Sequence, residues 1–279
     1  MARTWFITGS SRGLGREIAT AALERGHRVV ATARNPGQLE DLVDRYVGNV
    51  LALALDVTDA AAAHQAIDAA VSHFGALDIV VNNAGYADSA PIEEMSEASF
   101  RRQIETNLFG VVNVTKAALP YLRRQRSGHF LQFSSIGGRV GGTPGMGAYQ
   151  TAKFAVEGFS EVLNAEVKPL GISVTIVEPG GFRTDWGGAS MTTSVVGEDY
   201  EETVGAMNRF RESTVATWRG DPRRAAGIIL DVVDVAEPPL RLLLGAGAVD
   251  SAHQSSVARA AEAEQWAAVS RSADFPEGE

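Results

Sequence analysis

Residues 4–15 read Thr-Trp-Phe-Ile-Thr-Gly-Ser-Ser-Arg-Gly-Leu-Gly, and this stretch decides the fold class. The apolar run at residues 4–7 predicts a buried strand, and the three glycines that follow predict a tight turn. We expect a helix from about Leu14 to Arg25, with Gly26 as its C-cap. A strand, a glycine-rich turn and a helix that opens at the turn make a cradle for phosphate, because the free N–H groups at the helix start point at it. The alternative is an ordinary tight turn.

Further apolar runs alternate with helical patterns along the chain. Strands are expected at Arg28–Ala33, Val50–Leu55, Leu77–Val81, 128–133, Ile172–Val177 and Leu240–Leu244. Continuous Val/Ile/Leu runs are typical of strands buried on both faces, and right-handed crossovers then give a doubly wound topology. The sequence therefore predicts one α/β domain of Rossmann type, with a parallel sheet of about seven strands and helices on both faces.

The helical patterns complete this picture. Helices are expected at about 59–74, Glu97–Arg124, Gly147–Lys168 and 221–235. Asn107 and Gly110 are poor helix formers in mid-helix, so a local distortion is expected there. Residues 1–249 are expected to form the nucleotide-binding domain. Residues 250–279 are expected to form a tail with a helix at Val257–Val269, which could cover the pocket, pack on a partner subunit or do neither.

Composition excludes several classes of function. The chain has 25 basic and 34 acidic residues, a net charge of −9 and no basic block, so neither nucleic acid nor an anionic membrane is an expected partner. Without cysteine there is no disulfide, thiolate metal site or cysteine nucleophile, and the five histidines lack paired metal spacing, so no metal is expected. Neither a signal peptide nor an apolar run of about 20 residues is present, which makes the cytoplasm the expected compartment.

Charged residues at the strand ends bear on the choice of dinucleotide. An enzyme that prefers NAD is expected to place a carboxylate near the end of its second strand, against the ribose 2′-hydroxyl. Here that strand ends in Ala33-Arg34, and Arg12 and Arg34 offer cations suited to a 2′-phosphate, which favours NADP(H) over NAD(H). Two solvated surface arginines are the alternative. Asp56 is a candidate for the adenine amino group, or else an N-cap of the next helix.

A second cluster follows the strand at 128–133. Tyr149 and Lys153 are four residues apart and share one helix face, and an ammonium one turn away should lower the phenol pKa from about 10. Ser135 supplies a hydroxyl for a substrate oxygen, and the glycines between Ser135 and Tyr149 predict a pliable loop. The alternative is a Tyr and a Lys on an ordinary amphipathic helix.

Taken together, these features resemble the short-chain dehydrogenase/reductase family, in its shorter single-domain branch, over roughly residues 3–245. The resemblance rests on Thr8-Gly9-x-x-x-Gly13-x-Gly15, Asn82-Asn83-Ala84-Gly85, Asn107, Ser135, Tyr149-x-x-x-Lys153 and Pro179-Gly180…Thr184. Ser135 precedes Tyr149 by fourteen residues, one more than is usual in the family. We expect the loop at 141–145 to absorb the extra residue.

The resemblance implies a role for each matching residue. Tyr149 would exchange a proton with the substrate oxygen, Lys153 would lower its pKa and hold the nicotinamide ribose, and Ser135 would hydrogen-bond the substrate oxygen. Asn107 would anchor a water that links Lys153 to solvent. With the two arginines and Asp56, the expected cofactor-binding set is Gly9, Ser11, Arg12, Gly13, Leu14, Gly15, Arg34, Asp56, Val57, Asn83, Ala84, Gly85, Tyr149, Lys153, Pro179, Gly180 and Thr184.

The resemblance also implies a mobile flap over the substrate at 181–220. Its large apolar side chains are Trp186, Met191, Tyr200, Met207, Phe210 and Trp218. They suggest a bulky or hydrophobic carbonyl substrate such as a steroid, a polyketide-like ring or a long-chain ketone, unless they merely pack the flap. The expected activity is NADPH-dependent reduction of a ketone or aldehyde, in a homodimer or homotetramer. The alternatives are an NAD-linked alcohol or steroid dehydrogenase, and a catalytically silent NADP-binding regulator.

Overall fold

A computed structural model describes residues 2–184 and 190–275, so Trp186 lies outside the described residues. A seven-stranded sheet with the strand order β3-β2-β1-β4-β6-β7-β9 forms its centre, and every neighbouring pair is parallel. The strands are β1 (Thr4–Ile7), β2 (Arg28–Ala33), β3 (Val50–Ala54), β4 (Ile79–Asn82), β6 (Gly128–Phe133), β7 (Ile172–Pro179) and β9 (Arg241–Leu244). The predicted fold class is confirmed. The strand order reverses between β1 and β4, where sheets of this kind open a crevice.

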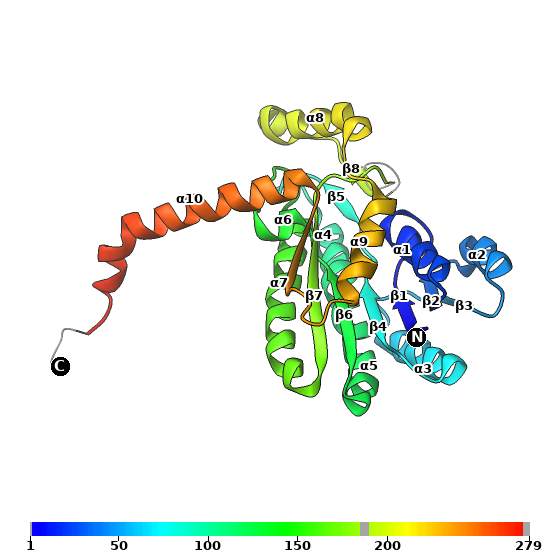
Figure 1. Cartoon of the computed structure of the whole chain (residues 1–279). Coiled ribbons are helices and arrows are strands. Elements are labelled where there is room, and N and C mark those ends of the chain that lie inside the picture. The colour runs from blue at the N-terminus through cyan, green and yellow to red at the C-terminus, as the bar shows by residue number, and fades with distance from the viewer. Residues whose placement is uncertain (1, 185–189, 276–279) are drawn as a thin grey trace.

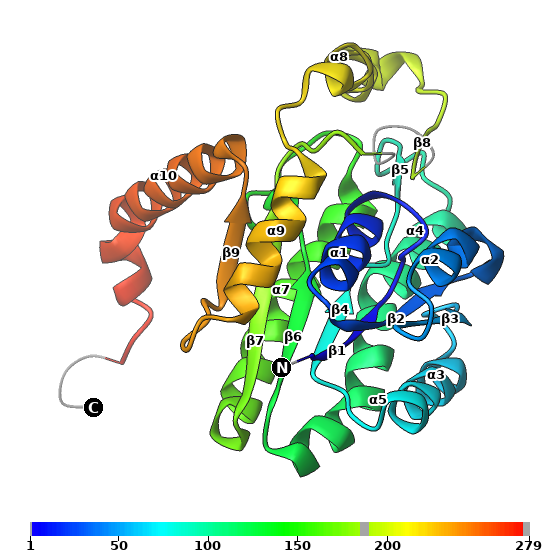
Figure 2. The ribbon, with the colours of Figure 1, turned by 45° about the vertical axis from the view of Figure 1, so that its right-hand side comes forward.

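Helices cover both faces of the sheet, as Figures 1 and 2 show. One face carries α1 (Gly13–Glu24), α2 (Glu40–Arg45) and α9 (Pro222–Val233), and the other carries α3 (Ala60–Phe74), α5 (Gly110–Gln125) and α7 (Gly147–Val167). A short 3-10 turn (Pro36–Leu39) leads into α2, and another (Lys168–Leu170) follows α7. Each face has its own apolar core, one centred on Ile18 and Ile229 and the other on Ile67 and Val114. Burial of these apolar side chains stabilises both layers.

The helix expected at Glu97–Arg124 is distorted where the sequence predicts it. It consists of α4 (Glu97–Ile104), a π-helical turn (Glu105–Phe109) and α5. The wide turn contains Asn107, which is completely buried. Single π turns are frequent at functional sites, and this one brings the Asn107 amide to Tyr86, in the segment that follows β4.

The flap region is joined to the body by a small second sheet that the sequence does not predict. β5 (Ala87–Ser89) pairs in parallel with β8 (Met191–Thr193). A 3-10 turn (Glu198–Tyr200), a π turn (Glu201–Gly205), α8 (Ala206–Thr214) and a 3-10 turn (Val215–Thr217) follow. Ser89 Oγ donates to Asn208 Oδ1 at 2.7 Å, which fastens α8 to β5. Figure 2 shows α8 above the carboxyl end of the main sheet.

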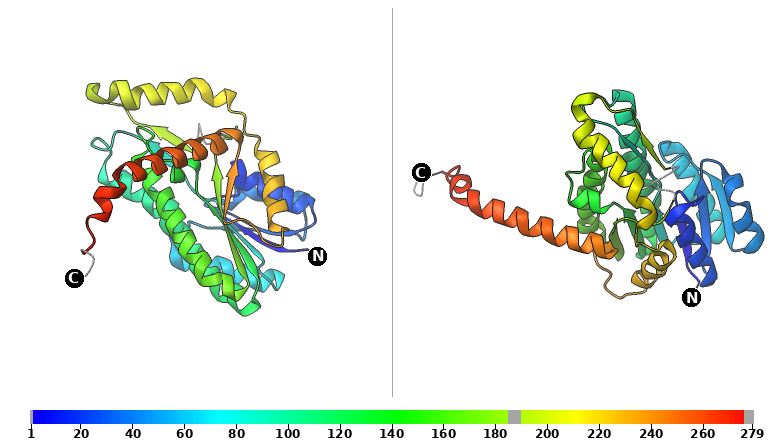
Figure 3. Two further views of the ribbon diagram at one scale, coloured as in Figure 1. Left: turned by 60° about the vertical axis from the view of Figure 1, so that its left-hand side comes forward. Right: turned by 90° about the horizontal axis from the view of Figure 1, so that it is seen from above.

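The C-terminal helix is longer than predicted. α10 (Ala246–Arg271) starts at Ala246, not at Val257, so the expected boundary between domain and tail falls inside it. Ala248 and Ala252 are the buried ones among its residues, and Figure 3 shows the helix extending away from the body. Arg259 Nη2 donates to the Val140 carbonyl at 3.0 Å. In the described part of the chain, no helix is both long and apolar enough to cross a membrane.

Candidate active site

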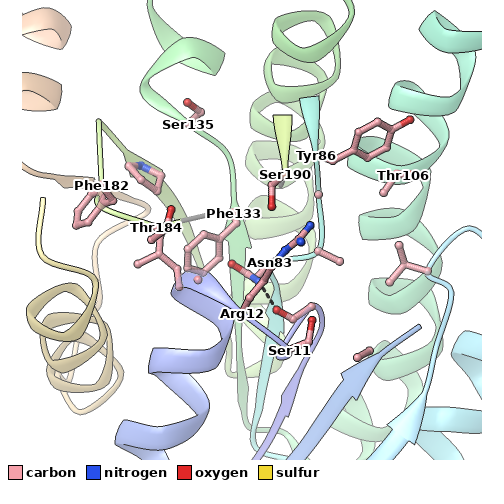
Figure 4. A pocket seen from close by; sticks show the side chains of 18 of the residues that line it. Ser11, Arg12, Asn83, Tyr86, Thr106, Phe133, Ser135, Phe182, Thr184 and Ser190 are labelled. Atoms are coloured by element: carbon pink, nitrogen blue, oxygen red, sulfur yellow. Dashed lines mark hydrogen bonds between the residues drawn. The ribbon is translucent and has the colours of Figure 1, made fainter. Parts of the chain in front are cut away.

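A cavity of about 350 Å³ lies at the carboxyl ends of the strands, beside the point where the strand order reverses. Most of the residues that the sequence singles out line it. From that set the wall includes Gly9, Ser11, Arg12, Gly13, Leu14, Arg34, Asp56, Val57, Asn83, Ala84, Gly85, Ser135, Tyr149, Lys153, Pro179, Gly180 and Thr184. In Figure 4, Ser11 and Arg12 lie at the start of α1, between Phe182 and Thr184 on one side and Tyr86 and Thr106 on the other.

The glycine turn after β1 is built for close approach. Gly9 and Gly13 have φ values of +69° and +58°, which side chains disfavour. A Cβ at Gly15 would lie 2.3 Å from the Gly9 carbonyl oxygen, so Gly15 packs the turn against α1 and does not itself line the cavity. Asn83 Nδ2 donates to the Thr8 and Gly9 carbonyls at 3.0 and 3.2 Å. The turn and the Asn83 loop therefore form one rigid cradle, and its shape fits a pyrophosphate.

Ser135, Tyr149 and Lys153 meet at the other end of the cavity. Ser135 is the N-cap of α6 (Ile136–Arg139), and its Oγ accepts a hydrogen bond from Gly137 N at 3.1 Å. The prediction of a pliable loop is thus wrong for residues 136–139, which are helical. Lys153 Nζ donates to the Phe133 carbonyl at 2.7 Å and lies 5.7 Å from the centroid of the Tyr149 ring. A hydroxyl, a phenol and an ammonium therefore share one small space.

Burial sets the protonation of this group. It raises the pKa of Tyr149 to about 12, although a hydrogen bond with the Ser135 side chain acts in the opposite direction. The net shift of the Tyr149 pKa is thus upward, opposite to the lowering expected from Lys153, because loss of solvent is the largest influence on the buried phenol. Burial also lowers the pKa of Lys153 to about 8, while Glu157 raises it. Near neutral pH the phenol therefore holds its proton.

Asn107 lies behind the cavity wall and does not line it. Its Nδ2 donates to the Tyr86 and Gln103 carbonyls at 2.9 Å each, and its Oδ1 accepts from Tyr86 N at 3.1 Å. A Cβ at Gly85 would lie 2.5 Å from that oxygen and 3.7 Å from Lys153 Nζ. Gly85 therefore lets the Asn107 amide and the Lys153 ammonium approach the same backbone segment.

The opposite end of the cavity carries the charged strand ends. Arg34 is exposed at the end of β2, and the strand itself ends in Ala33-Arg34 without a carboxylate. Asp56 is the one carboxylate among the described residues of the wall, and its Oδ1 accepts hydrogen bonds from Thr58 N at 3.0 Å and Thr58 Oγ1 at 2.8 Å. The N-cap of α3 is Asp59 and not Asp56. This end is thus predominantly cationic.

Several residues of the cavity wall are not predicted from the sequence. They are Ala33, Gln38, Leu55, Tyr86, Thr106, Phe133, Ser134, Phe182 and Ser190. Tyr86 directly follows Gly85 and Thr106 directly precedes Asn107. Their position next to a motif residue could therefore have indicated that they line the cavity. Phe182 and Ser190 belong to the flap, where no local pattern distinguishes wall from packing. Beside the phenol, Ala87, Met146 and Tyr149 form an apolar cluster against which Met191 packs.

Comparisons with known proteins agree with this geometry. A family model described as short chain dehydrogenase matches residues 3–194. The chain is 49% identical to Oxidoreductase BOA17 of Botryotinia fuckeliana, over 97% of this chain and 98% of that one. It is 37% identical to a 3-ketodihydrosphingosine reductase of Bacteroides thetaiotaomicron, over 86% of both chains.

Two solved structures are similar as well. A short-chain dehydrogenase from Streptomyces avermitilis has a TM-score of 0.92 and 38% identity, covering 98% of this chain and 100% of its own. An alcohol dehydrogenase from Thermococcus sibiricus, solved with 5-hydroxy-NADP, has a TM-score of 0.72 and 26% identity, covering 88% and 96%. The cradle, the cationic end and the Ser135–Tyr149–Lys153 group fit a nicotinamide dinucleotide lying along the cavity.

Proposed function

The chain belongs to the short chain dehydrogenase family and is an oxidoreductase whose structural relatives bind nicotinamide dinucleotides, and on this premise we propose that it uses NADPH to reduce a hydrophobic ketone or aldehyde. One observation carries the direction of reaction. The Tyr149 phenol is buried, hydrogen-bonded to Ser135, and has a pKa raised to about 12. Reduction of a carbonyl needs a proton donor, whereas alcohol oxidation needs a base, so a protonated phenol favours reduction.

In this proposal each side chain has a distinct task. The cofactor, when bound, supplies a hydride from its nicotinamide ring. Ser135 and Tyr149 hold the carbonyl oxygen of the substrate, where negative charge develops, and Tyr149 gives that oxygen its proton. Lys153 holds the nicotinamide ribose and places a positive charge beside the phenol. Asn107 uses both amide N–H groups on backbone carbonyls, and its oxygen keeps an acceptor position for the water of a proton relay.

The proposed cofactor site follows the cavity wall. The turn from Gly9 to Leu14 receives the pyrophosphate, and Asp56 and Val57 receive the adenine. The NADPH preference rests on Arg12 and Arg34 and on the lack of a carboxylate at the end of β2 among the described residues. The Asn83–Gly85 segment lines the adenosine side. At the nicotinamide end, Pro179, Gly180 and Thr184 complete the wall.

The proposed substrate class rests on the surroundings of the phenol. The Tyr149 ring packs in an apolar cluster with Ala87, Met146 and Met191, so the phenol stands in hydrophobic surroundings. One relative is a 3-ketodihydrosphingosine reductase, a name that denotes reduction of a ketone. We therefore expect hydrophobic ketones to be reduced faster than small hydrophilic ones.

NADPH oxidation by the purified protein tests the proposal across ketones and aldehydes that range from small aliphatics to long-chain and fused-ring compounds. Tyr149→Phe should lose at least about 100-fold in kcat/KM while its NADPH Kd stays within about twofold, because only the proton donor is removed. Tyr121→Phe is the matched control, since the Tyr121 phenol lies far from the cavity and bonds to Asp68. Full activity in Tyr149→Phe contradicts the mechanism. Tight NADPH binding without turnover of any compound favours the regulatory alternative.

A further inference from the structure

Four charged side chains from four elements form a group behind Lys153, away from the cavity. Glu157 belongs to α7, Glu178 to β7, Arg139 to α6 and Arg241 to β9. Arg241 Nη2 lies 2.9 Å from Glu157 Oε2, and Arg241 Nε lies 3.2 Å from Glu178 Oε1. Arg139 Nη1 lies 3.4 Å from Glu178 Oε1. The proposed mechanism uses none of these groups. Removing charges from water costs free energy that pairing offsets only in part.

The two carboxyls are held on several sides. The Glu178 side chain is completely buried, and the Glu157 side chain is 8% exposed. Burial is the strongest influence on Glu157 and raises the pKa of its carboxyl, whereas the neighbouring guanidinium groups of Arg241 and Arg139 favour the ionised form. Glu157 is thus held in place by its ion pair with Arg241.

Within this arrangement, Glu157 is the residue whose charge acts on the Lys153 ammonium. Glu157 follows it by one turn of α7, so both side chains lie on the same helix face. Lys153 is 4% exposed, and its Nζ donates to a neutral acceptor, the Phe133 carbonyl. Burial removes the stabilisation that water gives to the ammonium, and Glu157 is the side chain whose charge restores part of it.

We propose that Glu157 is a positioning residue that keeps the buried Lys153 protonated, and that Arg241, which pairs with both Glu157 and Glu178, holds its carboxylate in place for this purpose. Any effect of Glu157 on catalysis rests on the role proposed above for Lys153. The charge coupling between Glu157 and Lys153 is a property of the protein alone.

The chain contains three lysines, Lys116, Lys153 and Lys168, so NMR of protein with ¹³C-labelled lysine resolves each side chain. We expect Glu157→Gln to lower the pKa of Lys153 by about one pH unit, the scale expected when a partly buried unit charge one helical turn away is removed. Glu157→Asp retains the charge and should restore most of the shift. If Glu157→Gln does not fold, Glu157→Met fills the same space without an unpaired polar group and should give the same fall.

Glu161→Gln is the matched control. Glu161 lies one turn further along α7 and pairs with the same Arg241 at 2.6 Å, but its side chain is 54% exposed. Its substitution should leave the pKa of Lys153 within about 0.2 pH units, because water screens an exposed charge. An unchanged Lys153 in Glu157→Gln, or an equal shift in Glu161→Gln, overturns the proposal.

Activity separates this inference from the proposed function. The alkaline limb of the kcat/KM profile should move to lower pH in Glu157→Gln, together with the pKa of Lys153, and should not move in Glu161→Gln. A protein that reduces no carbonyl compound but shows the NMR shift refutes the proposed function alone. A reductase in which Lys153 titrates identically in Glu157→Gln and the parent protein refutes the positioning role alone.

Discussion

The Tyr149 phenol is 7% exposed, and the Lys153 ammonium beside it is 4% exposed. In water a cation would stabilise the phenolate, but here both groups have lost solvent, and the loss dominates. Near pH 7 the pair consequently carries both protons, which suits a site that must donate one. The same residues at the same spacing on an exposed helix would have a lower phenol pKa, because water would stabilise the phenolate.

Arg34 offers a test of cofactor choice. Arg34→Glu should raise the NADPH Kd at least about tenfold, because it replaces a charge-assisted contact to phosphate with a repulsive one, and should change the NADH Kd much less. Binding of both cofactors can be followed by fluorescence titration. Arg123→Glu, at the exposed far end of α5, controls for the general change in charge. Equal losses for NADPH and NADH rule out the assignment of Arg34.

At the residue scale, the sequence predicts which side chains react and how they are spaced, but it does not predict how deeply they are buried. Tyr149 and Lys153 share a helix face because of their spacing, and the structure places them on one cavity wall. Their spacing says nothing about burial, which sets both pKa values. Glu157 and Glu178 are far apart in sequence, and only the meeting of α7, β7 and β9 brings them to one arginine.

The short helix α6 depends on a missing side chain. A Cβ at Gly138 would lie 2.4 Å from Ser134 Oγ and 2.9 Å from Lys153 Cβ. Gly138→Ala should therefore force α6 away from α7, destabilise the protein by about 1–3 kcal/mol and reduce kcat by displacing Ser135. Urea unfolding and steady-state kinetics measure the two effects.

Gly158→Ala is the control, because Gly158 lies in α7 with no other atom near the added Cβ. It should stabilise the protein by about 0.5–1 kcal/mol through helix propensity. If both alanine variants are equally stable, the close packing of α6 on Lys153 is not what fixes Ser135.

At the scale of elements, continuous apolar runs predict the strands of the main sheet. β2 and β6 have the bounds predicted from their apolar stretches, and α3 begins after its Asp59 cap. α6 was missed because Ile-Gly-Gly-Arg has low helix propensity, and it forms through the Ser135 cap and the pairing of Arg139 with Glu178. β5 and β8 are three residues each, and they exist because distant segments meet.

Stability against pH is a property of the whole molecule, and two buried groups drive it in opposite directions. Burial and the charge of Glu157 raise the pKa of Glu178 from 4.5 to about 7. Between these values the folded carboxyl keeps a proton that the unfolded one releases, so its contribution to stability is lost as pH rises. Burial lowers the pKa of His129 from 6.5 to about 4. There the unfolded imidazole binds the extra proton, so stability increases as pH rises.

The two effects oppose each other between pH 4.5 and 6.5, so removing either group should change the slope of the free energy of unfolding against pH. Glu178→Gln removes one effect, and its stability should rise with pH across this range. His129→Gln removes the other, and its stability should fall. Urea titrations at several pH values give both slopes, and slopes of the same sign in the two variants contradict the assignment.

The pairing of β5 with β8 would allow an engineered disulfide to fix the flap to the body of the protein. Asp88 and Thr192 face each other in that pair, and the Thr192 hydroxyl already donates to the Asp88 carboxylate. Neighbouring strands lie about 4.8 Å apart, within the range that a disulfide spans. Because the chain has no cysteine of its own, cysteines at these two positions would be its sole thiols. Oxidation would then fasten the flap beside the phenol, and a reducing agent would release it, which places turnover under the control of an external thiol.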